Sequence, residues 1–477
     1  MGAGMVFSSM IFLWVFLPIV FILDRLSGRS RTLQNMLMLA AGLFFYAWGQ
    51  PDYLWLLLLS ILMNYGLGLA LSGMRRQPAR RLVLAAGVLA NLGILGYYKY
   101  FNFFANTINR GLGREIFGMR QIALPLGISF FTFQALTYLI DLYRGRYEAQ
   151  KNLLHLALYF SFFPKLTQGP IEKYRDFEPQ IRNRRQSLEK TGAGIRRFIY
   201  GLAKKVLIAD VLGVCVDRIY GMDMGNVNAV LAWLAILFYS LQLYYDFSGY
   251  SDMAVGLGKM FGFDLAENFN YPYIASSITD FWRRWHMSLT SWFREYLYFP
   301  LGGSRKGELR TYRNIFIIYM ATGLWHGASW DFICWGLFHG CFQVLERMGL
   351  GKLLEKTKVV KYVYTILVLC VGWLFFRVGD MGRSFGYLGR MFLPWKYTGS
   401  GYAVRELISN RAFFMFVCAI LGCGLIQRAG QKLAERVPVL AGWKDSVVEL
   451  IWCMFLLGCC IVMMVSSTYS AFLYMNF

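Results

Sequence analysis

The sequence predicts an all-α protein, a polytopic membrane bundle of helices, and three observations support that fold class. The 477 residues are 57% hydrophobic and only 16% charged, whereas a soluble domain averages about 25% charged residues. Many apolar runs approach the roughly 20 residues that a helix needs to cross a bilayer. The basic residues gather in short loops between those runs, which is the pattern that sets topology in membrane proteins.

The amino-terminal part contains the first predicted spans. The apolar runs cover residues 7 to 23, 33 to 48, 53 to 71 and 82 to 98. The loops Arg25 to Arg31 and Arg75 to Arg81 are basic, while the loop between the second and third runs carries no positive charge. The positive-inside rule therefore places the amino terminus outside and both basic loops in the cytoplasm. The first run has no basic residue before it and no small-residue cleavage site, so it reads as a retained span.

The next segments are more polar and less regular. Residues 99 to 122 mix aromatic and basic side chains and are expected at the membrane interface. Residues 123 to 142 form a span whose polar side chains either pack against a neighbouring helix, which is the commoner case, or line a cavity. Prolines interrupt residues 153 to 171, which predicts a re-entrant element, and His155 at its start is expected to be structural. Residues 172 to 198 are rich in arginine and predict a cytoplasmic loop.

The rest of the chain continues the membrane pattern. The further predicted segments are residues 199 to 220, 228 to 258, 360 to 378, 412 to 428 and 447 to 466, with a cytoplasmic stretch at 342 to 361 and an outside loop at 392 to 410. Within residues 228 to 258, Asp246 is a candidate partner for an arginine of residues 283 to 294. A metal site at this aspartate is disfavoured. Roughly eleven crossings are expected in all, within a single membrane domain of residues 1–477.

Charge and cysteine content exclude several classes of protein. The formal net charge is +22, but no stretch combines a basic patch with a platform on which bases stack, so the charge favours anionic lipid and topology over nucleic acid. The nine cysteines lie almost all in apolar runs and are expected to be small buried hydrophobes. No zinc-like spacing is present, so no metal is expected.

Candidate catalytic residues lie in the stretch 268 to 340. Three of the four histidines of the chain are found there, at His286, His326 and His339. An ionisable side chain in an apolar membrane segment is costly unless it has a partner or a task, and imidazole suits proton transfer near neutral pH. His286 and His326 are 40 positions apart, which allows the chain to return and bring both rings to one cavity. The alternative for each is a structural role, which is the expectation for His339.

Two motifs in this stretch resemble a known family. They read RRWHMSLTSWFREYLYFPLGG and TGLWHGASW, and they resemble the membrane-bound O-acyltransferase family, above all its alginate O-acetylation branch and more distantly its teichoic acid D-alanyl transfer branch. The resemblance implies a helical bundle with a central tunnel. It also implies that His326 is the catalytic histidine, as a general base or as a nucleophile, and that His286 is the upstream polar residue of the same site.

The resemblance further implies a function. We expect an O-acyltransferase of the bacterial cytoplasmic membrane that moves acetyl from cytoplasmic acetyl-CoA toward an extracytoplasmic polysaccharide, through a partner acetyltransferase and with no bound cofactor. Arg283, Arg284 and Arg294 are expected to meet the phosphates of acyl-CoA; the alternative is an interfacial helix with a tryptophan belt. The rival functions are D-alanyl transfer to teichoic acid, a transporter with a histidine proton relay, and a structural scaffold.

Overall fold

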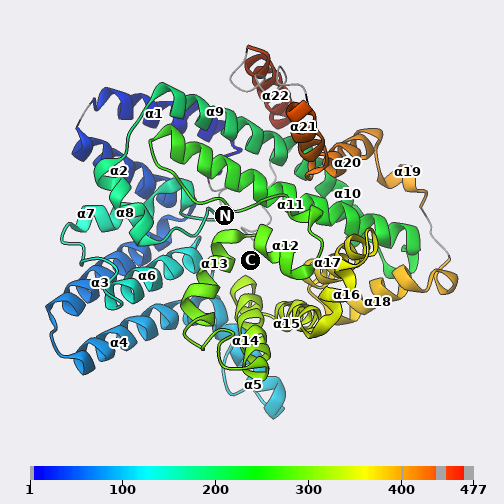
Figure 1. The fold of residues 1–477 in the computed structure, drawn as a ribbon, viewed down its shortest axis with the longest axis horizontal. Helices are drawn as coiled ribbons and strands as arrows, with labels where there is room; N and C mark the ends of the chain where they lie inside the picture. The colour runs from blue at the N-terminus through cyan, green and yellow to red at the C-terminus, as the bar shows by residue number, and fades with distance from the viewer. Residues whose placement is uncertain (1–4, 29, 399–401, 437–446, 467–477) are drawn as a thin grey trace. The chain divides into compact units, whose positions relative to one another are not determined.

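The structure is a computed structural model, and it describes residues 5–28, 30–398, 402–436 and 447–466. These residues form helices and loops with no β-strand among them, which confirms the predicted all-α fold (Figure 1). The chain divides into two compact units, one of Met1–Phe198 and Met253–Ala266 and the other of Ile199–Asp252 and Glu267–Phe477. A single domain for residues 1–477 stays a prediction.

The first unit is built from the amino-terminal helices. Its α-helices are α1 (Leu17–Leu26), α2 (Arg31–Gly49), α3 (Leu54–Gly73), α4 (Gln77–Leu95), α5 (Phe101–Leu112), α6 (Ile128–Tyr143), α7 (Leu153–Ser161), α8 (Tyr174–Asn183) and most of α9 (Leu188–Ala203). Short π or 3-10 segments join them, namely η1 (Phe12–Phe16), η2 (Pro51–Tyr53), η3 (Gly96–Tyr100) and η4 (Phe163–Lys165). Helices α3 and α4 pack on α6, and α2 packs on α7.

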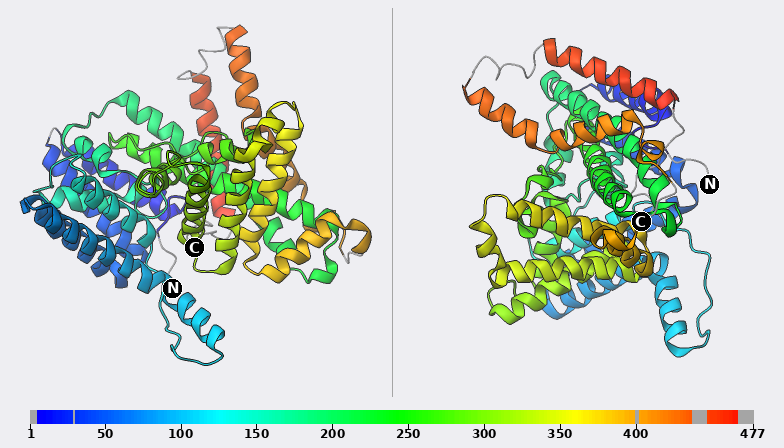
Figure 2. Two further views of the ribbon diagram at one scale, coloured as in Figure 1. Left: turned by 60° about the horizontal axis from the view of Figure 1, so that its bottom comes forward. Right: turned by 90° about the vertical axis from the view of Figure 1, so that its right-hand side faces the viewer.

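A hairpin extends from this unit after α4. Helices α4 and α5 form one helical run, Gln77–Leu112, and the chain then returns beside α5 as a loop. The Asn109 side chain donates to the Phe117 carbonyl at 2.7 Å, and Asn102 donates to the Arg120 carbonyl at 2.8 Å, so side-chain amides hold the loop. Figure 2 shows the hairpin standing away from the other helices of the unit in both views. Its place at a membrane interface stays a prediction.

The break predicted within residues 153 to 171 is confirmed. Helix α7 is followed by the single 3-10 turn η4, and the chain stays irregular until α8. Lys165 in this turn is fully buried, donates from Nζ to the Tyr159 carbonyl at 2.5 Å, and lies 4.1 Å from the centroid of the Tyr159 ring. A buried ammonium is costly unless such partners surround it. The element therefore places an ionisable side chain in the interior of the unit.

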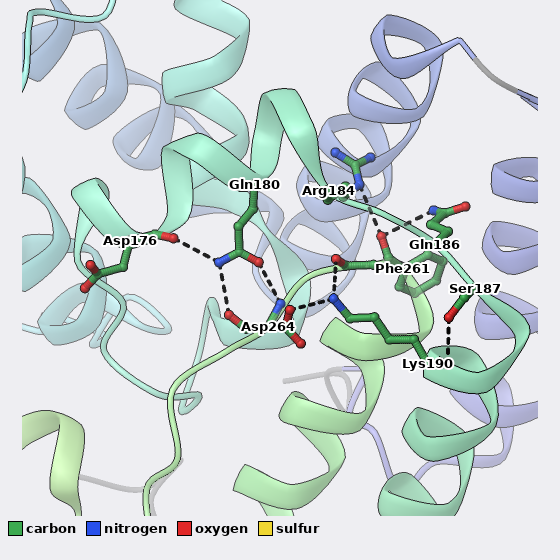
Figure 3. Close-up of polar contacts among 9 residues, drawn as sticks. Asp176, Gln180, Arg184, Gln186, Ser187, Lys190, Phe261 and Asp264 are labelled. Atoms are coloured by element: carbon green, nitrogen blue, oxygen red, sulfur yellow. Dashed lines mark hydrogen bonds and ion pairs between the residues drawn. The ribbon is translucent and has the colours of Figure 1, made fainter.

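The turn after α11 is bonded to side chains of α8 and α9, as Figure 3 shows. Gln180 bonds both backbone groups of Asp264, accepting from its N–H at 2.7 Å and donating to its carbonyl at 3.1 Å. Lys190 Nζ donates to Asp264 Oδ2 at 2.6 Å and to the Gly262 carbonyl at 2.8 Å. Gly262 has a φ of 86°, which a residue without a Cβ adopts at little cost. Paired side chains thus hold this turn.

The second unit contains the 268 to 340 stretch. Its helices include α10 (Asp210–Tyr220), most of α11 (Ala229–Met260), α12 (Ile278–Arg284), α13 (Met287–Phe293), α14 (Glu308–His326), α15 (Trp330–Leu345), α16 (Gly351–Glu355), α17 (Val360–Val378), α18 (Met381–Phe392), α19 (Val404–Leu407), α20 (Asn410–Gly422), α21 (Leu425–Arg436) and α22 (Val447–Ser466). The short segments are η5 (Lys204–Ala209), η6 (Met224–Asn226), η7 (Pro272–Ile274), η8 (Arg294–Tyr298), η9 (Glu346–Leu350) and η10 (Pro394–Lys396).

Helices α14 and α15 pack tightly against each other in this unit. A methyl group on Gly323 of α14 would collide with the Phe332 carbonyl oxygen, and one on Gly336 of α15 would collide with the Tyr319 carbonyl oxygen. Small residues let helix backbones approach in this way. The close approach fixes the end of α14, where His326 lies.

Five helical runs of the described chain are long and apolar enough to cross a membrane. They are Pro51–Gly73, Gln77–Leu112, Ala229–Met260, Val360–Val378 and Val447–Ser466. Several other predicted spans consist of shorter helices; the run at 123 to 142, for example, contains the 16-residue α6. The count of eleven crossings stays a prediction. Residues 399–401 of the predicted outside loop and residue 29 of the first basic loop lie outside the described residues.

Candidate active site

His286 lies at the junction of two short helices. Helix α12 ends at Arg284, and His286 is the residue before α13. Its φ of 46° and ψ of 54° lie in the left-handed region, which costs a residue with a Cβ about 1–3 kcal/mol and is found most often at functional sites. The side chain is 1% exposed. The strained junction therefore turns the imidazole into the interior of the second unit.

Asn268 holds the His286 ring. Its Oδ1 lies 3.0 Å from His286 Nδ1 and also accepts from the Ser288 hydroxyl at 2.9 Å. The amide nitrogen donates to the Ser251 hydroxyl, on α11, at 3.2 Å. The opposite ring nitrogen of His286, Nε2, is buried and has no hydrogen-bond partner among the described residues. One edge of the imidazole is thus fixed, and the other has no polar contact among the described residues.

His326 is the last residue of α14, and Gly327 leaves the helix in an extended conformation. The imidazole is 3% exposed and packs among aromatic rings. Its centroid lies 4.9 Å from that of Trp325, 5.0 Å from that of Trp335 and 5.3 Å from that of Phe376. The side chain that the sequence singles out as catalytic therefore stands at a helix end, inside the second unit.

Trp325 brings the two histidines together. Its ring centroid lies 5.8 Å from that of His286 and 4.9 Å from that of His326. The two imidazoles are therefore no further apart than these two distances added together, although 40 positions of sequence separate them. The expectation that the chain returns and brings both rings to one place agrees with this geometry. Their catalytic roles stay predictions.

His339 occupies a separate aromatic environment. It is fully buried, with ring centroids 5.2 Å from Trp282 and 5.3 Å from Trp335. Neither ring nitrogen has a hydrogen-bond partner among the described residues. Trp335 also touches His326, so one indole separates the two histidines. The packing is consistent with the structural role expected for His339.

The three candidate arginines have different surroundings. Arg283 and Arg294 are exposed, whereas Arg284 donates to Asp280 at 3.0 Å and to the Asn270 carbonyl at 3.3 Å. Arg284 therefore holds α12 in place, and the other two are available to phosphates. The tryptophans of the same stretch, Trp282, Trp285 and Trp292, are at most 7% exposed. They belong to the protein core, so the alternative of an interfacial tryptophan belt is wrong for these rings.

Sequence reasoning missed two features of this unit. Asp246 forms an ion pair with Lys205, at 2.8 Å, which the sequence did not suggest, and its expected pairing with the arginine region stays a prediction. Lys205 also pairs with Asp210 at 2.7 Å. The second omission is Asn268, whose contact with His286 crosses 18 positions and joins residues that do not lie on one helix. The only sign of this contact in the sequence is that an amide residue, Asn268, precedes a proline-containing turn and then the histidine.

Comparison with known proteins places these residues in a wider context. Residues 40–376 match the model of a family described as membrane-bound O-acyltransferases. The chain is 40% identical to a probable alginate O-acetylase AlgI of Pseudomonas putida, over 99% of this chain and all of the other. It is 36% identical to a peptidoglycan O-acetyltransferase of Helicobacter pylori, over 81% of this chain and 80% of that protein. It is 30% identical to a teichoic acid D-alanyltransferase of Bacillus subtilis, over 53% of this chain and 68% of that protein.

Proposed function

Because the chain belongs to the membrane-bound O-acyltransferase family, and is thus a multi-pass membrane enzyme that transfers acyl groups to oxygen, we propose that it moves an acetyl group from a cytoplasmic acyl-CoA toward an extracytoplasmic polysaccharide. The observation that carries the proposal is the similarity to an alginate O-acetylase along essentially the whole of both chains. The cytoplasmic membrane of a bacterium is the proposed location, since the relatives are bacterial.

His326 is the proposed catalytic group. Acyl transfer breaks the thioester C–S bond and forms a C–O bond, so the hydroxyl proton must reach a base and the thiolate must leave with a proton. A neutral imidazole can take the first proton and deliver the second. Burial among Trp325, Trp335 and Phe376 keeps bulk water from competing with the acceptor hydroxyl.

A covalent route through His326 is the alternative for the same residue. The imidazole would attack the thioester carbonyl, release the thiol and form an acyl-imidazole, which the acceptor hydroxyl would then attack. Rapid acid quench of the enzyme with radiolabelled acetyl-CoA distinguishes the two routes. Label on the protein that disappears in His326→Ala indicates the covalent route, and label only on the acceptor indicates general base catalysis.

His286 is the proposed contact for the acceptor. It shares Trp325 with His326, which supports action of both rings on one hydroxyl. Exposed Arg283 and Arg294 are the proposed contacts for the phosphates of acyl-CoA, because guanidinium groups bind phosphate through charge-assisted hydrogen bonds. Arg284 contributes less, since Asp280 already engages it.

The names of the relatives support the proposed class of acceptor. Their names record action on alginate, peptidoglycan and teichoic acid. We propose a polysaccharide acceptor, reached through a partner acetyltransferase on the outer face of the membrane. Among the relatives named, the alginate protein matches more of this chain than the D-alanyltransferase does, which favours acetyl over D-alanyl.

The test uses purified full-length protein in lipid nanodiscs. Acetyl-CoA is supplied on its own and with oligosaccharide acceptor, and free thiol and acetylated product are measured. Acceptor-dependent thiol release supports the proposal. Consumption of a D-alanyl carrier-protein thioester in preference to acetyl-CoA would favour the teichoic acid alternative. Consumption of neither thioester would favour a transporter or a scaffold.

A further inference from the structure

The proton on His286 can be placed from its neighbours. Asn268 Oδ1 faces the Ser288 backbone N–H at 3.3 Å and His286 Nδ1 at 3.0 Å. A backbone N–H only donates, so the Asn268 atom that faces it is the amide oxygen and not the amide nitrogen. An amide oxygen only accepts, so Nδ1 of His286 must carry a proton. The neutral ring then has its lone pair on Nε2.

The His286 ring packs against aromatic side chains, and its Nε2 lone pair meets no donor among the described residues. Nε2 has no hydrogen-bond partner among the described residues, and the ring lies 4.8 Å from Phe247 and 5.8 Å from Trp325. A buried acceptor without a donor is unfavourable and calls for an explanation. A hydroxyl group that enters beside Trp325 would supply the missing donor. The Nε2 atom of His286 is therefore suited to accept a hydrogen bond from an O–H group.

We propose that Asn268 is a positioning residue that holds His286 in its Nδ1-protonated tautomer, so that Nε2 accepts a hydrogen bond from the hydroxyl of the acyl acceptor. The acceptor part of this inference rests on the proposed function. The tautomer part rests only on the contacts of Asn268 and stands or falls separately.

Backbone contacts keep Asn268 in register with His286. The Asn268 carbonyl accepts from the Met287 N–H at 3.0 Å, and the Asn270 N–H donates to the Arg284 carbonyl at 2.9 Å. These two bonds lie on either side of His286 along the chain. The Asn268 amide nitrogen is meanwhile engaged by Ser251, so the amide cannot rotate without losing contacts at both ends. The acceptor for Nδ1–H is thus present before substrate arrives.

The direct test is spectroscopic. The chain has only four histidines, so the full-length protein with ¹⁵N-labelled histidine in nanodiscs gives few imidazole signals, and His286→Ala identifies those of His286. We expect a protonated Nδ1 and a bare Nε2. Asn268→Asp should keep this tautomer because a carboxylate oxygen also accepts, and Asn268→Ala should lose it. A protonated Nε2 in the unaltered protein, or an unchanged tautomer in Asn268→Ala, would overturn the inference.

Activity gives the second readout. Asn268→Ala should lower acyl transfer about tenfold or more, Asn268→Asp should restore most of it, and the double variant with His286→Ala should be no worse than His286→Ala alone. Ser251→Ala is the matched control, because it removes a contact of the same amide that does not involve the imidazole, and its loss should be smaller. Additive losses in the double variant would show that Asn268 acts elsewhere, which contradicts the proposal.

The outcomes remain distinguishable if a variant fails. If Asn268→Ala does not accumulate in the membrane, the tautomer of Asn268→Asp decides, since a protonated Nε2 there would contradict the proposal. Full transfer by His286→Ala would refute the proposed contact between His286 and the acceptor. In that case an Nδ1-protonated ring would still support the tautomer assignment.

Discussion

Replacing Gly323 by alanine should separate α14 from α15 and lower both stability and acyl transfer. The new methyl group would collide with the backbone carbonyl of Phe332, and a backbone atom cannot rotate away as a side chain can. The helices must move apart by about 1 Å before the methyl reaches ordinary contact distance. Overpacking of this kind costs about 3 kcal/mol at its upper range, and the better helix propensity of alanine returns about 1 kcal/mol. We expect a net loss of about 2 kcal/mol.

The same displacement reaches the site, because Gly323 precedes His326 by one helical turn. A misplacement of about 1 Å can cost on the order of 100-fold in rate, so acyl transfer should fall by about that factor. The measurements are denaturant unfolding in detergent and acetyl transfer in nanodiscs. In Gly336→Ala the new methyl group on α15 would collide with the Tyr319 carbonyl of α14, so stability and acyl transfer should fall by similar amounts. Gly93→Ala on α4, with nothing within 4 Å, is the matched control. Unchanged stability and activity in Gly323→Ala would refute the packing argument.

Two further predictions concern charged groups. Arg283→Gln and Arg294→Gln should raise the KM for acyl-CoA, with a smaller effect at high salt because exposed charges are screened. Arg284→Gln should lower stability and leave the KM unchanged. A raised KM in Arg284→Gln together with an unchanged KM in the other two variants would contradict the assignment. Lys205→Met should cost about 3–5 kcal/mol of unfolding free energy, since it removes the ammonium that pairs with the buried carboxylate of Asp246. Lys204→Met, at a lysine that is 29% exposed, should cost only about 1 kcal/mol; equal losses in denaturant unfolding would contradict this ranking.

The helical class and the position of the two histidines could be predicted from the sequence. Apolar runs and basic loops predict the helical class, because both patterns depend on residues that are close together in the chain. His286 and His326 were recognisable because ionisable groups are rare in their surroundings and because the motifs around them resemble a family. Their meeting at Trp325 depends on the return of the chain, which sequence spacing permits without requiring.

Contacts between distant residues were not predictable in the same way. Asn268 reaches His286 because the chain folds back on itself, with the Met287 N–H bonded to the Asn268 carbonyl. The partner of Asp246 proved to be Lys205, which lies in the π-helical segment η5, and a π turn shifts side chains away from the positions that a regular helix period predicts. Burial of Trp285 likewise depends on Trp373, a partner 88 positions away.

The most direct test of the account is polysaccharide acetylation by His326→Ala. The variant is expressed in cells that lack the native gene, and acetyl content of the polymer is measured with the membrane abundance of the protein. Loss of the catalytic imidazole should lower acetylation by about 10²- to 10⁴-fold, and His286→Ala should lower it less. His155→Ala, in the first unit, is the control and should change little. Full acetylation by His326→Ala at normal abundance would contradict the account.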